Sequence, residues 1–503
     1  MASLGGSVPF FRSFAPRFSR EFFTCRQCLT QSPNYAAKPA AFRRQFGAFS
    51  FTQNTNNVNS AAVYARAKKA FPSTWKRSAS GSAAASAIET GTPKSRSRFP
   101  DVSHKSVAYW LLGSAASVFG IVVFGGLTRL TESGLSITEW RPVTGSLPPM
   151  NADDWESEFA KYRDSPEFQL LNPHMTLSEF KSIYYMEWIH RLWGRFVGLS
   201  FVLPAVYFIA RKKVSKPIAL RLAGIAGLIG FQGFLGWWMV KSGLKDDLFA
   251  PGSHPRVSQY RLTAHLGAAF VCYVAMLWNG LAILRSHRLL ADPEAGTKLL
   301  DSLRDPKLKV FRRSVAGLAL LVFTTVISGA LVAGLDAGLI YNEFPFMGNG
   351  LAPPKSELFD QRYSRLEDKS DLWWRNMLEN PSLVQLDHRI LAMTTFTSIM
   401  ALWAYSKTPA MKRLLPPAAR KGVHGVVGFA FMQVGLGIST LLYLVPTPLA
   451  SAHQAGSLFL LTWVLVLGSR VWHPSRTAKL LQMAVKARGQ TLSNAAAHGP
   501  GRV

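Results

Sequence analysis

Eight long apolar segments constrain the fold of this chain more than any other feature of its sequence. Most of them reach the ~20 residues that an α-helix needs to cross the hydrocarbon core of a bilayer. With 48% hydrophobic and 17% charged residues, the composition is typical of a polytopic membrane protein. The sequence therefore predicts an all-α membrane protein with eight transmembrane helices. The segments lie at roughly 106–128, 187–210, 222–240, 262–284, 314–335, 388–406, 422–445 and 449–469.

An internal repeat divides these segments into four plus four. Related short motifs recur in the same order in both halves, which is the pattern expected of a duplicated unit. We therefore expect two pseudo-symmetric four-helix bundles. The matching pairs are GLSITEW (134–140) with GLIYNEF (338–344), His190-Arg191 with His388-Arg389, QGFLG (232–236) with QVGLG (433–437), and His265 with His453.

This division predicts five regions along the chain. The first is a basic leader and the last a tail, with two helical halves between them. The regions are the leader at 1–100, the N-terminal four-helix half at 101–285, a linker at 286–313, the C-terminal four-helix half at 314–472 and the tail at 473–503.

The leader has the composition of a mitochondrial transit peptide. It contains 15 Lys and Arg residues but only two acids, Glu21 and Glu89, and it has no long apolar run. The alternative is a disordered basic arm, for which the charge pattern of the loops disfavours nucleic acid as the partner. Cys25 and Cys28 have metal-binding spacing, but they lie in this leader without a second pair, so we assign them no role.

The charges of the connecting loops predict the topology. The connections 211–221, 285–313 and 407–421 hold 5, 8 and 5 Lys and Arg against 0, 4 and 0 acids. The alternate connections hold 5, 4 and 5 against 9, 2 and 8; these are 129–182, 241–261 and 336–382. The positive-inside bias then places both termini and the basic loops in the mitochondrial matrix, and the acidic loops in the intermembrane space.

Four histidines occupy repeat-related positions near the starts of the even-numbered segments: His190, His265, His388 and His453. By the predicted topology all four lie at a similar depth near the intermembrane space. Two imidazoles facing each other in a helical bundle suit axial ligation of a haem iron. A zinc site is disfavoured because no cysteine, aspartate or third histidine accompanies either pair.

Charged residues next to these histidines mark the membrane edge. Glu187, His190 and Arg191 stand at i, i+3 and i+4 and so share one helix face. Arg191 and Arg389, like Arg129, could bind haem propionates, or could instead snorkel or neutralise nearby acids such as Glu187 and Asp387. For Glu139 and Glu343 we expect a role in shaping or capping the loops.

Four motifs lie within residues 105–472: GGLTRLTESGLSITEW (125–140), Glu187-x-x-His190-Arg191, LDHR (386–389) and AHQAG (452–456). In this combination the chain resembles the haem A synthase family in its mitochondrial form. It implies that the C8 methyl of haem O is oxidised by successive hydroxylations to the formyl group of haem A, which serves cytochrome c oxidase. Some bacterial members carry a cysteine pair in the first external loop, but residues 129–182 contain no cysteine.

The resemblance also implies a role for each candidate residue. Substrate haem O would lie between His190 and His265 with Arg191 beside it, and a resident haem b between His388 and His453 with Arg389 beside it. Glu187 would act as the essential acid or base, because a carboxylate can stabilise a cationic methyl carbon and deprotonate an attacking water.

The implied location of the protein is the mitochondrial inner membrane. The implied partners are an electron-transfer protein, for which ferredoxin is a candidate, and also haem O synthase and oxidase assembly factors. A homo-oligomer is a further expectation. Two other functions fit part of the pattern: a dihaem cytochrome b-like electron carrier, in which both haems are permanent, and a haem transporter. All four histidines on one membrane side disfavour the transporter.

Overall fold

The computed structural model describes residues 99–249 and 255–497 of the chain. These residues belong to one compact unit, Ser97–Val503. The predicted leader at 1–100, with Cys25 and Cys28, lies outside the described residues except for its last two.

The described residues are helical, and their one β feature is an isolated bridge between Met347 and Gly350. The long helices of the first half are α2 (Lys105–Leu130), α5 (Leu177–Ala210), α6 (Lys216–Gly243) and α7 (Gln259–Ala291). Those of the second half are α9 (Pro306–Gly334), α12 (Pro381–Lys407), α14 (Pro417–Leu442) and α15 (Thr447–Val471). The shorter elements are η3 (Thr144–Ser146), α3 (Ala152–Arg163), α4 (Pro166–Leu171), η4 (Asp246–Phe249), α8 (Pro293–Ser302), η5 (Ala337–Leu339), α10 (Lys355–Leu358), η6 (Gln361–Tyr363), α11 (Leu372–Glu379) and α13 (Pro409–Leu414), with α16 (Ser475–Ala497) at the C-terminal end.

Seven of the described helices are long and apolar enough to cross a membrane: α2, α5, α6, α7, α9, α14 and the helical segment that begins with α15. The all-helical membrane architecture predicted from the sequence is thus confirmed. The predicted sixth segment forms α12, a helix of 27 residues that is not among the seven. It contains the polar residues Asp387, His388 and Arg389 and several threonines, which lower its hydropathy.

The chain starts its long helices with strong local signals. α5 begins with a capping box, in which the Thr176 side chain accepts from the Glu179 N–H and Glu179 caps the Thr176 N–H in return. Helices α9, α12, α14 and α15 carry proline in the first turn, where its missing N–H costs nothing. Because of its capped polar start, α5 begins ten residues before the apolar segment that predicts it.

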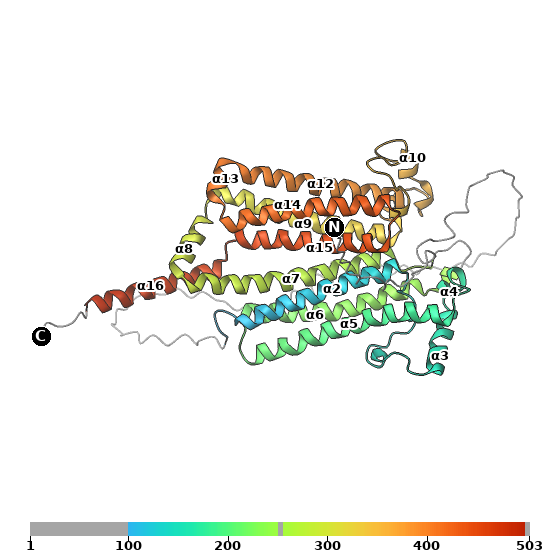
Figure 1. The fold of residues 1–503 in the computed structure, drawn as a ribbon, viewed down its shortest axis with the longest axis horizontal. Helices are drawn as coiled ribbons and strands as arrows, with labels where there is room; N and C mark the ends of the chain where they lie inside the picture. The colour runs from blue at the N-terminus through green and yellow to red at the C-terminus, as the bar shows by residue number, and fades with distance from the viewer. Residues whose placement is uncertain (1–98, 250–254, 498–503) are drawn as a thin grey trace, which may run out of the picture. The chain divides into compact units, whose positions relative to one another are not determined.

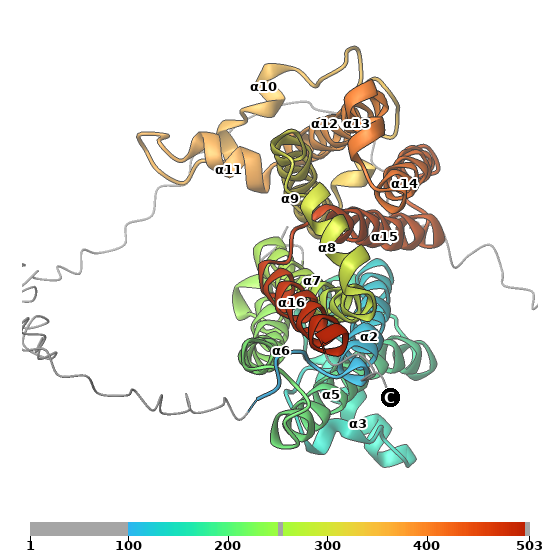
Figure 2. The ribbon, with the colours of Figure 1, turned by 90° about the vertical axis from the view of Figure 1, so that its left-hand side faces the viewer.

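The long helices pack in two groups of four (Figures 1 and 2). In the first group, α2 packs against α5 and α7, and α6 packs against the same two helices. In the second group, α9 packs against α12 and α15, and α14 likewise packs against both. Helices α3, α4 and α10 lie at one end of the bundle, whereas α8 and α13 lie at the other (Figure 1).

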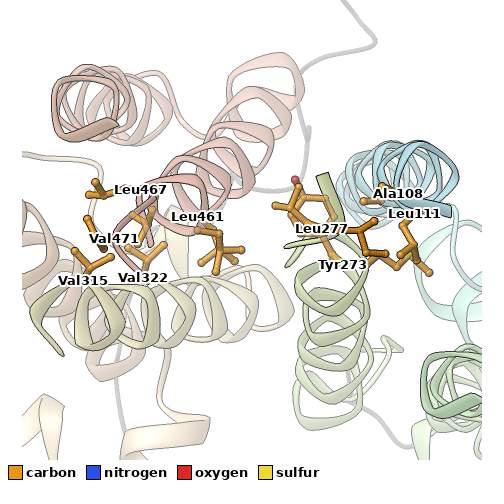
Figure 3. Close-up of a cluster of buried hydrophobic side chains, with 14 of the residues drawn as sticks. Ala108, Leu111, Tyr273, Leu277, Val315, Val322, Leu461, Leu467 and Val471 are labelled. Carbon is orange, nitrogen blue, oxygen red and sulfur yellow. The ribbon is translucent and has the colours of Figure 1, made fainter. Parts of the chain in front are cut away.

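The two groups meet through their first and last helices. α7 packs on α9, and α15 packs on α2. A continuous apolar core fills this junction, with side chains from α2, α7, α9 and α15 (Figure 3). The Tyr273 and Thr462 hydroxyls hydrogen-bond across it at 2.6 Å, and the Gln454 side-chain amide donates to the Val122 carbonyl at 3.0 Å. Polar groups in such a core need partners, because no water is available there.

A second, smaller core covers the N-terminal end of α5. Trp155, Phe159 and Tyr162 of α3 pack there against Phe180 and Tyr184 of α5. Ile137 of the preceding loop belongs to the same cluster. This cluster fixes the first extramembrane loop on α5, next to the segment of α5 that holds Glu187 and His190.

Removing a side chain from the central junction should destabilise the protein more than removing one from the lipid-facing surface. Leu461 on α15 is 1% exposed, whereas Leu320 on α9 is 66% exposed. We expect Leu461→Ala to lower the free energy of unfolding by about 2–5 kcal/mol, because it leaves a cavity. Leu320→Ala should change it by about 0.5 kcal/mol or less. Thermal melting of the detergent-purified protein measures both, and equal effects would contradict the assigned core.

Candidate functional site

Glu187 is buried at the junction between the bundle and the extramembrane loop, and it is 4% exposed. Its Oε2 accepts hydrogen bonds from the Ser136 hydroxyl at 2.7 Å and from the Ile137 N–H at 2.8 Å. Its Oε1 accepts two from the Arg191 guanidinium, at 3.0 Å from Nε and 2.7 Å from Nη2. Four donors thus hold a charged carboxylate in a fixed position, as a buried carboxylate requires.

Arg191 also ties the loop to α5 through the backbone. It donates to the carbonyl of Ile137 at 2.7 Å and to the carbonyl of Glu139 at 2.9 Å. The guanidinium is therefore occupied by the loop and by Glu187. Of the roles left open by the sequence, neutralising Glu187 is the one for which the structure gives a direct contact.

Arg389 binds the corresponding loop of the second half. It donates to the carbonyls of Tyr341 at 3.0 Å, Glu343 at 2.9 Å and Phe346 at 3.0 Å. Tyr341 and Glu343 are the repeat partners of Ile137 and Glu139. The equivalent arginine of each half thus contacts equivalent carbonyls, and no ion pair joins Arg389 to Asp387 among the described residues.

Gln385 takes the place of Glu187 in the second half. It is 3% exposed, and its side-chain amide donates to the Tyr341 carbonyl at 2.9 Å. Its Oε1 is buried without a hydrogen-bond partner. The two halves therefore have the same framework around this position, but only the first places a carboxylate there.

Each of the four histidine rings packs against a glycine on the preceding long helix. A Cβ added at Gly125, Gly329 or Gly437 would lie 2.7–3.1 Å from the ring Cε1 atom, so the ring would have to shift; at Gly236 the distance would be 3.5 Å, an ordinary contact. Sequence reasoning missed these glycines, although their recurrence one helix before each histidine was a usable signal. The pairs are Gly125 with His190, Gly236 with His265, Gly329 with His388, and Gly437 with His453.

The structure brings the histidines together in pairs within each half. His190 is close enough to His265 to interact electrostatically, as His388 is to His453. Each of the four histidines is half-buried. Nδ1 is buried without a partner in His190, His265 and His453, whereas Nδ1 of His388 contacts the Ser328 hydroxyl at 2.7 Å.

This donor set fits haem better than a bare metal ion. Two imidazoles can supply both axial ligands of a haem iron, and an apolar macrocycle needs no further charged ligands. Across residues 99–249 and 255–497, no group of three or more His, Cys, Asp or Glu side chains is placed to hold a metal ion. The glycine-backed rings with unpaired nitrogens are consistent with a ligand between them.

Two other charged candidates, Arg129 and Glu139, have partners within the protein. Arg129, at the end of α2, pairs with Asp336 at 2.7 Å, and Asp336 also binds Arg256 at 2.9 Å. Glu139 pairs with Arg141 and Lys161. Desolvation alone would raise the pKa of Glu139, but the positive charges of Lys161 and Arg141 outweigh it and hold this pKa below its usual value.

Comparison with known proteins decides the family. The family model described as COX15-CtaA, cytochrome oxidase assembly protein, matches residues 108–465. The chain is 55% identical over 371 residues to haem A synthase COX15 of Saccharomyces cerevisiae, an alignment that covers 74% of this chain and 76% of the relative. The human haem A synthase COX15 is 47% identical over 368 residues, covering 73% and 82%. The chain belongs to the haem A synthase family.

This result confirms the family expected from the sequence motifs, that of the oxidoreductases that convert haem O to haem A. A further relative, from Schizosaccharomyces pombe, is named a haem A synthase-mitochondrial ferredoxin fusion protein. It is 52% identical over 391 residues, which cover 76% of this chain and 63% of that longer protein.

The two arginines should each protect only the loop of their own half. Arg389→Leu removes three hydrogen bonds to backbone carbonyls, a loss of about 3 kcal/mol that corresponds to roughly hundredfold faster local opening. We expect faster amide hydrogen exchange at 338–350 and unchanged exchange at 134–146. Arg191→Leu should give the reverse pattern, so each variant is the control for the other. Equal exchange of both loops in both variants would contradict these contacts.

Proposed function

We propose that this haem A synthase oxidises haem O in its N-terminal half and holds a resident haem b in its C-terminal half. His190 and His265 would bind the substrate haem, and His388 and His453 would bind haem b, which supplies one-electron transfer. The single observation that carries this assignment is the exchange of Glu187 for Gln385 within otherwise equivalent surroundings.

Glu187 is the proposed acid or base of the reaction. Its four hydrogen-bond donors fix the carboxylate three residues, about one helical turn, before His190. A carboxylate held there stabilises positive charge at an adjacent carbon and accepts a proton from water. An amide, as in Gln385, does neither.

We also propose that α12 is an eighth membrane span, which completes two pseudo-symmetric bundles at 101–285 and 314–472. Its threonine hydroxyls are compatible with lipid because they bond one turn back, Thr394 to the Ile390 carbonyl at 2.8 Å and Thr397 to the Met393 carbonyl at 2.8 Å. At the junction, the last helix of each group packs on the first helix of the other, α7 on α9 and α15 on α2. This reciprocal packing supports two pseudo-symmetric bundles.

The proposed location is the mitochondrial inner membrane, with both termini, the linker 286–313 and the tail 473–503 in the matrix. The loop charges support this orientation. The acid-rich connections carrying α3, α4 and α10 lie at one end of the bundle, opposite the basic connections carrying α8 and α13 (Figure 1). The region 1–100 would then be the transit peptide.

A ferredoxin is the proposed electron-transfer partner. The support is the relative from Schizosaccharomyces pombe, which is named as a fusion with a mitochondrial ferredoxin. Fusion of two proteins in one chain is consistent with a shared electron path, because it raises their effective concentration. Haem O synthase and oxidase assembly factors, as well as a homo-oligomer, remain predictions.

The resident haem b should depend on the second histidine pair. We expect His388→Ala and His453→Ala each to lose most of the haem b absorbance of the purified protein, because one axial ligand is removed.

The packing of glycine against the His453 ring offers a milder pair of test variants on α14. Gly437→Ala would place a Cβ 2.8 Å from the His453 ring, whereas Gly435→Ala meets nothing within 4 Å.

Both glycine variants change helix propensity equally, so only Gly437→Ala should weaken haem b binding. Retention of haem b in all the second-half variants, with its loss in His190→Ala, would exchange the roles of the two halves.

Glu187→Gln should abolish haem A synthesis. The amide can keep the contacts with Ser136 and Ile137, but its NH₂ group would face the Arg191 guanidinium instead of accepting from it. We therefore expect haem O to bind with some loss of stability and haem A to be undetectable by mass spectrometry of extracted haems. Gln385→Glu is the matched control and should leave the product unchanged. Normal haem A from Glu187→Gln would favour the dihaem electron carrier.

A further inference from the structure

Glu167 is a buried carboxyl group for which the proposed function has no use. It lies in α4, within the first extramembrane loop, and it is 3% exposed. Its Oε2 is buried without a hydrogen-bond partner. A carboxyl group is rarely buried unless it is paired or has a function, because its desolvation is costly.

Glu167 interacts both with Glu187 of the candidate site and with an exposed acid of the loop. The Tyr162 hydroxyl of α3 contacts its carboxyl group, and Asn172 donates to that hydroxyl at 3.1 Å. Glu187 of α5, together with Arg129 and Glu132 at the end of α2, is close enough to interact with it electrostatically. Glu132 is exposed, as is Asp247 on the adjoining η4.

These neighbours favour the protonated form of Glu167. Burial, together with the negative charges of Glu132 and Glu187, raises the pKa of Glu167 to about 8, although Tyr162 and Arg129 act in the opposite direction. A carboxyl group with a pKa near the surrounding pH can both accept and release a proton. An exposed carboxyl, which stays ionised, cannot store one.

The proposed reaction produces protons that must leave the buried site. If the formyl oxygen comes from water, one methyl group and one water yield one formyl group, four protons and four electrons. The four electrons leave one at a time to the proposed electron-transfer partner, a ferredoxin, and the protons pass first to Glu187. The Arg191 guanidinium cannot accept them, since it is always protonated.

We propose that Glu167 is the proton carrier that accepts protons from Glu187, through hydrogen-bonded water, and passes them to the exposed Glu132 and the aqueous phase. This inference rests on the proposed function of the first half. Glu167 does not touch the substrate in this scheme; it restores the ionised form of Glu187 between the oxidation steps. Without it, Glu187 would lose its proton more slowly after each transfer.

The main alternative is a structural carboxylic acid that only hydrogen-bonds Tyr162. Glu167→Gln distinguishes the two, because an amide of the same size keeps that contact but cannot carry a proton. Glu156→Gln is the matched control: Glu156 lies in the same loop, on α3, but its side chain is 56% exposed and pairs with Arg163. It interrupts an ion pair in the loop without touching the proposed path.

The first measurement is independent of turnover. Infrared spectra of the full-length purified protein should show a protonated carboxyl band that is present at pH 7 and titrates away above about pH 8, because the carboxyl group ionises there. The band should be missing in Glu167→Gln and retained in Glu156→Gln. The same band in both variants would overturn the proposal.

The second measurement follows haem A formation from haem O in the same preparations. Glu167→Gln should slow it ~10-fold or more with unchanged haem content, whereas Glu156→Gln should not. The wild-type rate should rise with pH toward about 8, as Glu167 ionises and becomes able to accept a proton, and this dependence should vanish in Glu167→Gln. A normal rate and pH profile in Glu167→Gln would overturn the proposal.

The proposed function has a separate test in the same assay. Haem A formation by Glu187→Gln at the wild-type rate would overturn the role of Glu187 and, with it, the relay. Loss of activity in Glu187→Gln with a normal rate in Glu167→Gln would overturn the relay alone.

Discussion

The architecture of each half depends on one arginine that holds an extramembrane loop against a membrane helix. Arg191 and Arg389 donate to the carbonyls at equivalent loop positions, Ile137 with Glu139 and Tyr341 with Glu343. Loop carbonyls at a membrane edge need donors, and a guanidinium supplies several from one side chain. Because each arginine directly follows a histidine, the loop is positioned relative to the imidazole in both halves.

The same framework supports two different environments. In the first half, the side chain three residues before the histidine is a carboxylate, and it accepts two of its four hydrogen bonds from Arg191. In the second half it is an amide that donates to the loop. A fixed charge in a buried position is costly to maintain, so its presence in one half alone favours a chemical role there over a structural one.

Sequence reasoning identified the helices and the histidines but not what surrounds them. Gly125 and Gly437 belong to motifs that the sequence shows, but their contact with an imidazole emerges only when the preceding helix packs on the ring. Arg129 was a candidate for binding a propionate, yet it pairs with Asp336, more than two hundred residues away. Glu167 drew no notice because a single acid in an acidic loop is normally exposed.

The sequence by itself determined the helical membrane class, the repeat and the family, because hydrophobic length and motif order are local properties of the chain. It also determined which residues are equivalent between the halves. Only the tertiary structure decided that Arg191 binds Glu187 and Arg389 binds backbone alone, that glycines support the four rings, and that Glu167 is buried near Glu187. These facts depend on contacts between helices and loops that are distant in sequence, and burial and desolvation arise only when those elements pack together.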